Sequence, residues 1–167
     1  MRATGEVMSV GRTAEESLLK AIRSLEDGKN HLHLEKFDRE NMSTEELLDY
    51  IKEGTDDRLY AIAQLMWIGV DTSVIYRETM IDMFFLDKIS NIIDEENILK
   101  EHKKDASYIY DAKRMGFSDA AIAKIWDTSE KEVFDLRKQE KIFPVYKMID
   151  TCASEFESYV PFFYSTY

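Results

Sequence analysis

The stretch GFSDAAIAKIWDTSEKEVFDLRKQEK, residues 116–141, decides the fold. It holds two apolar patterns at helical spacing, separated by a few polar residues. Ser118 stands where a helix N-cap is expected, and Ser129 with Glu132 has the spacing of a capping box, in which the two side chains satisfy free backbone amides. Asp127 lies in the turn, where its short side chain tolerates left-handed backbone. The stretch therefore predicts a helical hairpin.

The same signals recur towards the N-terminus. Thr13 with Glu16, and Ser43 with Glu46, have capping-box spacing, and Gly28 offers a left-handed stop to the first of these helices. Apolar residues at helical spacing fill each interval between a start and a stop. Helices are expected between residues 13 and 28, 43 and 54, 57 and 69, 71 and 80, 81 and 102, and 107 and 116. In the longest one, the predicted inward sector comprises Phe84, Phe85, Ile89, Ile92, Ile93 and Leu99.

The pattern changes after residue 142. Pro144 and Pro161 bracket a segment rich in Val, Tyr, Phe and Thr, which predicts extended chain. With 6 Gly and 2 Pro among 167 residues, we expect an all-α fold: an irregular multi-helix domain of helical hairpins with an extended C-terminal segment. AIAQL at 61–65 and AIAKI at 121–125 would fit two similar helical subdomains, but chance explains so short a match equally well.

Charge and cysteine usage limit the function classes. Lys and Arg number 22 against 33 Asp and Glu, a net charge of −11, which disfavours binding to nucleic acid and to anionic membranes. No apolar run approaches the roughly 20 residues that span a bilayer, and the first residues lack a signal peptide. Cys152 is the only cysteine, so we expect a reduced, cytoplasmic setting, with Cys152 as a small buried apolar residue.

No catalytic chemistry can be singled out. The sequence has no glycine-rich phosphate loop, no G-x-S-x-G motif and no paired Cys and His. His31, His33 and Glu35 alternate and could share one face of an extended strand as metal ligands, but a polar loop does not hold three ligands rigidly, so a solvated loop is favoured. The sequence predicts no catalytic, cofactor or metal site.

The hairpin at 116–141 also matches the spacing of a DNA-reading helix-turn-helix. Its second helix, however, has no net charge, and a DNA reader gains affinity from several unopposed basic residues. The four basic and four acidic side chains are Lys131, Arg137, Lys138, Lys141, Glu130, Glu132, Asp135 and Glu140. A structural hairpin is therefore favoured, and a stand-alone acidic regulator that binds DNA stays as the alternative.

Several stretches resemble the middle of the large chain of carbamoyl-phosphate synthase. They are GEVMSVGRTAEESLLKAIRSLE at 5–26, TMIDMFFLDKI at 79–89, GFSDAAIAKIWDTSEKEVFDLRKQEKI at 116–142 and PVYKMIDTCASEFESYVPFFYSTY at 144–167. The last is long, ungapped and specific to that family, and the resemblance runs from end to end of the chain.

The resemblance implies a noncatalytic helical domain, called the oligomerization or connection domain, between two ATP-grasp halves. The parent enzyme makes carbamoyl phosphate from bicarbonate, ammonia released from glutamine on a small glutaminase subunit, and two ATP with Mg or Mn. No ATP-grasp motif lies in this chain, so no cofactor site is carried over. The implied division is the end of the first half at 1–10, the helical domain at 11–142 and the lead-in to the second half at 143–167.

Two sets of residues are candidates for contacts with partners. The first helix could self-associate through an apolar stripe, although ordinary core packing would explain the stripe equally well and Leu19 lies off its centre. This set is Leu18, Leu19, Ile22 and Leu25. The aromatic tail is expected to pack on the following half or, without it, on the chain's own helices or a symmetry mate, or to be poorly ordered. This set is Tyr159, Phe162, Phe163, Tyr164 and Tyr167.

Overall fold

The computed structural model describes residues 7–25, 28–152, 155–156 and 162–167. The predicted all-α fold is confirmed, since helices make up most of the ordered structure and only two short strands follow them. The helices are α1 (Ala14–Ser24), α2 (Thr44–Tyr50), α3 (Arg58–Trp67), α4 (Thr72–Thr79), α5 (Met83–Glu101), α6 (Ile109–Arg114), α7 (Asp119–Trp126) and α8 (Glu130–Gln139), with 3-10 turns η1 (Glu35–Phe37) and η2 (Ala106–Tyr108) and strands β1 (Val145–Met148) and β2 (Phe163–Thr166).

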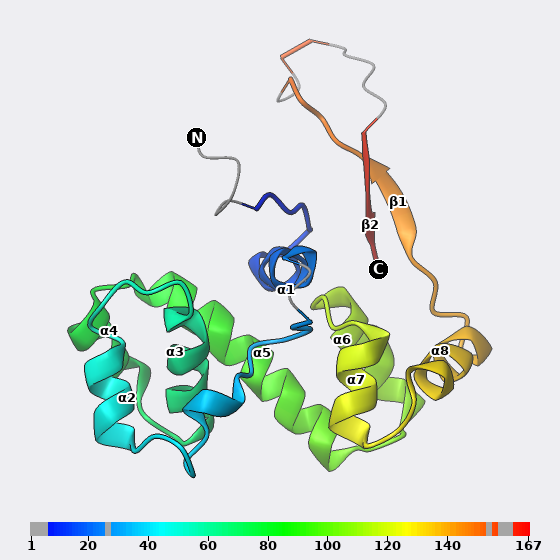
Figure 1. The fold of residues 1–167 in the computed structure, drawn as a ribbon. Coiled ribbons are helices and arrows are strands. Elements are labelled where there is room, and N and C mark those ends of the chain that lie inside the picture. The colour runs from blue at the N-terminus through cyan, green and yellow to red at the C-terminus, as the bar shows by residue number, and fades with distance from the viewer. Residues whose placement is uncertain (1–6, 26–27, 153–154, 157–161) are drawn as a thin grey trace.

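The long helix α5 is the spine of the molecule (Figure 1). The α2–α3 hairpin and α4 pack at its N-terminal part, the α7–α8 hairpin packs at its C-terminal part, and α1 crosses between them. The buried side chains of all these helices form one apolar core. Its largest fully buried members are Leu19, Leu32, Phe37, Leu47, Ile51, Ile62, Leu65, Ile75, Leu86, Ile92, Leu99 and Phe117.

The helix starts predicted from serine are confirmed. Ser43 and Ser129 each accept the N–H of the third helical residue, and the glutamate at that position accepts the serine N–H in return. Ser118 caps α7 by accepting the N–H of Ala121 at 3.0 Å. Asp127 ends α7 in the left-handed region at φ 54°, as its position in the turn predicted. These signals act within four residues, and at these three helix starts tertiary packing does not override them.

The predicted capping box of the first helix forms only in part. Thr13 accepts the Glu16 N–H at 3.1 Å, but the Glu16 carboxylate accepts the N–H of Arg12 rather than that of Thr13. That carboxylate is also engaged by groups from other parts of the chain, described below, and these tertiary partners account for the difference.

Burial differs from the sequence prediction at several positions. Phe84 and Phe85 were expected inside α5 but both are exposed, because the helix turns Leu86 into the core instead. Leu19 lies at the centre of the core rather than beside the buried face of α1. Cys152, expected to be buried, is a free, half-buried cysteine.

The extended C-terminal segment forms a two-stranded antiparallel ribbon. Val145 pairs with Thr166, and Met148 pairs with Phe163. In Figure 1 the ribbon rises from the α6–α8 side of the molecule, and the far end of β2 returns towards α1. Among the helices of the described ranges, none is both long and apolar enough to span a bilayer.

Candidate functional site

The end of β2 meets the N-terminal turn of α1 at one buried carboxylate, that of Glu16. Its Oε2 atom accepts the backbone N–H of Arg12 at 2.7 Å and the hydroxyl of Thr166 at 3.1 Å. Its Oε1 atom pairs with the ammonium of Lys20 at 2.8 Å. Both carboxylate oxygens are therefore bonded, which compensates for the cost of burying the charge. We call this contact between β2 and α1 the junction.

Lys20 holds the second connection of the junction. Its Nζ donates to the carbonyl of Val10 at 3.0 Å and to the carbonyl of Ser165 in β2. The same ammonium lies 5.6 Å from the centre of the Tyr164 ring, within the range of a cation–π interaction. Lys20 thus ties the segment before α1, the helix α1 and the strand β2 together.

A buried ion network lies on the other side of the β2 end. Asp119 accepts from Lys113 Nζ at 2.9 Å and from Arg137 Nε at 2.7 Å, so one carboxylate joins α6, α7 and α8. Burial lowers the pKa of Lys113, and the Asp119 charge only partly restores it. Lys113 also lies 5.0 Å from the centre of the Tyr167 ring, and burial raises the pKa of that phenol. The final aromatic residue is therefore seated on this network.

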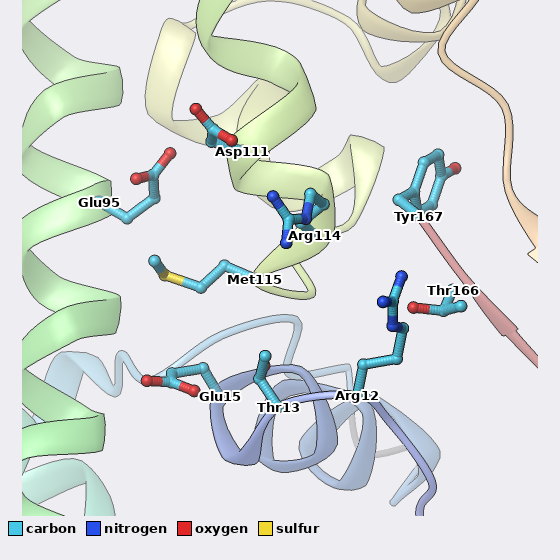
Figure 2. Close-up of a pocket in the computed structure, with 9 residues that line it drawn as sticks. All are labelled: Arg12, Thr13, Glu15, Glu95, Asp111, Arg114, Met115, Thr166 and Tyr167. Atoms are coloured by element: carbon cyan, nitrogen blue, oxygen red, sulfur yellow. The ribbon is translucent and has the colours of Figure 1, made fainter.

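A cavity of about 440 Å³ opens beside the junction (Figure 2). It is lined by Arg12, Thr13, Glu15, Glu95, Asp111, Arg114, Met115, Thr166 and Tyr167. Figure 2 shows the carboxylates of Glu95 and Asp111 on one side and the Arg12 guanidinium on the other, beside the end of β2. The cavity is open to solvent and carries charges of both signs.

The acidic residues of the cavity differ in environment. Burial raises the pKa of Glu95, the charge of Asp111 raises it further, and the Oε1 atom of Glu95 is buried with no hydrogen-bond partner among the described residues. Burial acts the same way on Glu15, but hydrogen bonds from Asn91 and Lys88 outweigh it and lower the pKa of Glu15. In this cavity the ionised form of Glu15 is therefore stabilised, whereas the ionised form of Glu95 is destabilised.

The predicted self-association residues of α1 have different positions. Leu19 and Ile22 are buried in this chain's own core, Leu18 is half-buried and Leu25 is exposed. Only Leu25 and part of Leu18 thus have surface to offer to another chain. The α1 interface itself stays a prediction.

The predicted aromatic tail divides into two parts. Phe162 and Phe163 are exposed, whereas Tyr164 and Tyr167 are half-buried against Lys20 and Lys113. The end of the tail thus docks on the chain's own helices, one of the outcomes expected of it. Tyr159 lies outside the described residues.

His31 and His33, expected in a solvated loop, instead form a small aromatic cluster with Trp67, and His31 is buried. His31 and His33 stack at 5.9 Å, and His33 pairs with Asp38 at 2.8 Å. Burial, together with Lys124 and other nearby cationic groups, lowers the pKa of His31 to about 4. Within the described part of the chain, no three His, Cys, Asp or Glu residues are arranged to hold a metal ion.

The hairpin of α7 and α8 gives the DNA-binding alternative no support. Arg137 is committed to Asp119, and Lys131 pairs with Asp135 at 2.9 Å. Phe134 lies beneath two of the basic side chains, so much of the positive charge of α8 is engaged within the chain. The hairpin instead packs against α5 through α7, and Asp119 joins α7 to α6 and α8.

The sequence did not indicate the junction, because its bonds join residues up to 150 positions apart. The only local sign was the Thr13 and Glu16 spacing, which pointed to a cap.

A comparison with protein families provides independent information: the family model described as the carbamoyl-phosphate synthetase large chain, oligomerisation domain, matches residues 6–141.

Proposed function

The chain belongs to the family of the carbamoyl-phosphate synthetase large chain oligomerisation domain, and we propose that within such a large chain it is a noncatalytic connector with two tasks. The first is to associate with further copies of itself. The second is to hold the polypeptide that follows it at a fixed position relative to its helices, so that the two ATP-using halves of the enzyme keep a defined geometry.

The parent reaction is part of this proposal. The large chain would make carbamoyl phosphate from bicarbonate, glutamine-derived ammonia and two ATP, with Mg or Mn bound in the catalytic halves and a glutaminase small subunit as partner. A cytoplasmic location also belongs to the proposal, because a single cysteine suits a reducing compartment.

The junction is the observation that supports the connecting task. Thr166 is buried, and its hydroxyl reaches the Glu16 carboxylate, which Arg12 and Lys20 also bind. A connector that merely tethered two halves would need no such anchor, because a flexible linker would serve. Exposed Phe162 and Phe163 next to the anchored end supply apolar surface that a following catalytic half could cover.

Replacement of Thr166 by valine tests the anchor. Valine keeps the shape of threonine but cannot donate to Glu16, and a hydrogen bond to a charged group contributes about 1.5–3 kcal/mol. We expect the hydrogen-exchange protection of the β1 and β2 amides to fall by about tenfold or more, with the amides of α5 unchanged.

Ser165→Ala is the matched control. Ser165 is exposed and bonds Lys20 through its backbone carbonyl, which the substitution preserves. The control should exchange like the unsubstituted chain. Equal protection in Thr166→Val and Ser165→Ala would contradict the anchoring role.

A further inference from the structure

The corner between α4 and α5 exposes an apolar cluster that the fold does not use. The cluster, here called the corner patch, comprises Tyr76, Met80, Met83, Phe84 and Phe85. Met80 is 72% exposed, Phe84 54% and Phe85 58%, whereas the neighbouring apolar residues Leu86 and Ile89 of α5 are buried. In Figure 1 this corner lies at the opposite side of the molecule from the strands. The corner patch is therefore separate from the two strands.

Met80 is held in the corner patch against its own backbone preference. It caps α4 in the left-handed region at φ 55°, where its N–H donates to the Tyr76 carbonyl at 2.7 Å. Glycine is the residue that adopts this conformation without cost, and any side chain there is strained. A large apolar side chain at a strained and exposed position gains nothing within this chain, which points to a contact outside it.

The two phenylalanines are held in a fixed arrangement. Their rings meet edge to face with centroids 5.3 Å apart, and the Lys88 ammonium lies 5.3 Å from the centre of the Phe84 ring. Lys88 is fixed in turn by Glu15 at 3.3 Å. The start of α5 is set by Asp82, whose carboxylate accepts the Phe84 N–H at 2.8 Å. Pre-arranged aromatic rings lose little conformational entropy when they bind, as the central residues of protein interfaces do.

We propose that the corner patch is the surface through which two copies of this chain associate, an inference that rests on the self-association in the proposed function. The charges that flank the patch suit a self-complementary contact. Arg77 and Asp87 are both exposed. Hydrogen bonds from Ser73 lower the pKa of Asp71, and the charge of Arg77 lowers it further only weakly. A two-fold axis through the patch would bring the apolar centres together and let Arg77 of one copy approach Asp87 of the other.

The size of the patch fits the centre of a dimer interface. Phe84 and Phe85 are 54% and 58% exposed, so each has roughly half of the 150–250 Å² of an aromatic side chain left to bury, while a stable interface needs about 800 Å² from each partner. The patch would supply the apolar core, and the charged residues of α4 and α5 would form the rim. A partner of high positive charge would fit poorly, because aromatic rings and two methionines, rather than carboxylates, dominate the surface.

The test measures mass against concentration for the whole chain by sedimentation velocity and light scattering. Phe84→Glu with Phe85→Glu should raise the dissociation constant by about thirtyfold or more, since central aromatic residues dominate interface energies. Circular dichroism should stay unchanged, because both rings are exposed. Phe134→Glu, an exposed aromatic position on α8, is the matched control and should associate like the unsubstituted chain.

A second variant keeps the test decisive if the double substitution disturbs folding. Met80→Gly relieves the positive φ and should raise the denaturation midpoint, yet it should weaken association because it removes the most exposed side chain of the patch. Leu25→Glu probes the competing α1 surface and should leave association intact.

The outcomes distinguish self-association itself from its assignment to the corner patch. If the unsubstituted chain associates and the corner variants associate equally well, the corner patch is refuted while self-association stands. If only Leu25→Glu dissociates the copies, the interface belongs to α1. If the unsubstituted chain stays a single copy at every concentration, self-association and the corner patch both fail.

Discussion

At the scale of single residues, Gly116 determines how closely α1 can approach the turn between α6 and α7. A β-carbon built on Gly116 would lie 2.8 Å from the Cα atom of Glu16, closer than real contacts allow. Gly116 also has φ 99°, and its carbonyl accepts a hydrogen bond from the Arg23 guanidinium at 2.5 Å. The buried position of Glu16, and with it the junction, thus depends on the absence of a side chain at this one position.

Gly116→Ala should therefore destabilise the chain by about 3 kcal/mol or more, because it combines an unfavourable positive φ with a backbone clash. Urea denaturation followed by circular dichroism measures the change. Gly69→Ala is the control: Gly69 has φ 86°, but open space surrounds its missing β-carbon. That variant should cost only about 1 kcal/mol. Equal losses for the two variants would show that the α1 approach is not tight.

At the scale of elements, the C-terminal end of α5 is completed by a side chain from α7. Trp126 is buried, and its indole N–H donates to the carbonyl of Leu99 at 2.8 Å. This carbonyl is among the last four of α5, which have no partner within the helix itself. Trp67 presents the opposite case, since its indole nitrogen is buried and has no partner in the described part of the chain.

Changing each tryptophan to phenylalanine should separate these two cases. Trp126→Phe leaves the Leu99 carbonyl buried and unpaired and should lower the free energy of unfolding by about 2–4 kcal/mol. Trp67→Phe removes an unsatisfied donor and should change it by less than about 1 kcal/mol. Thermal and urea denaturation of both variants give the comparison. A larger loss for Trp67→Phe would contradict the assigned hydrogen bonding.

Elements could be predicted from the sequence where their signals are local. The caps at Ser43, Ser118 and Ser129 depend on residues three positions away, so the sequence located them correctly. The inward face of α5 could not be predicted as well, because apolar residues surround much of its first turns and only tertiary packing decides that Phe84 and Phe85 point outwards. The local spacing of Thr13 and Glu16 predicts only a helix cap. It cannot show that the Glu16 carboxylate bonds Thr166, because Thr166 lies at the other end of the sequence.

At the scale of the whole molecule, α5 separates two surfaces with different proposed tasks. The corner patch lies at its beginning, while the ribbon of β1 and β2 lies on the other side of the molecule (Figure 1). Two copies could therefore meet at the corner without covering the exposed residues of β1 and β2. The arrangement lets self-association and connection to a following segment occur at the same time.

The net charge of the chain makes a final prediction about association. Each copy carries a formal charge of −11, so two copies repel each other at long range. Salt screens this repulsion, with a Debye length that falls from about 10 Å at 0.1 M to about 3 Å at 1 M, but it leaves apolar contacts in place. If the corner patch supplies most of the binding energy, the dissociation constant should fall by several-fold as sodium chloride rises from about 0.05 to 0.5 M. Sedimentation at each salt concentration measures this trend. A dissociation constant that rises with salt would mean that ion pairs, rather than the apolar centre, hold the copies together.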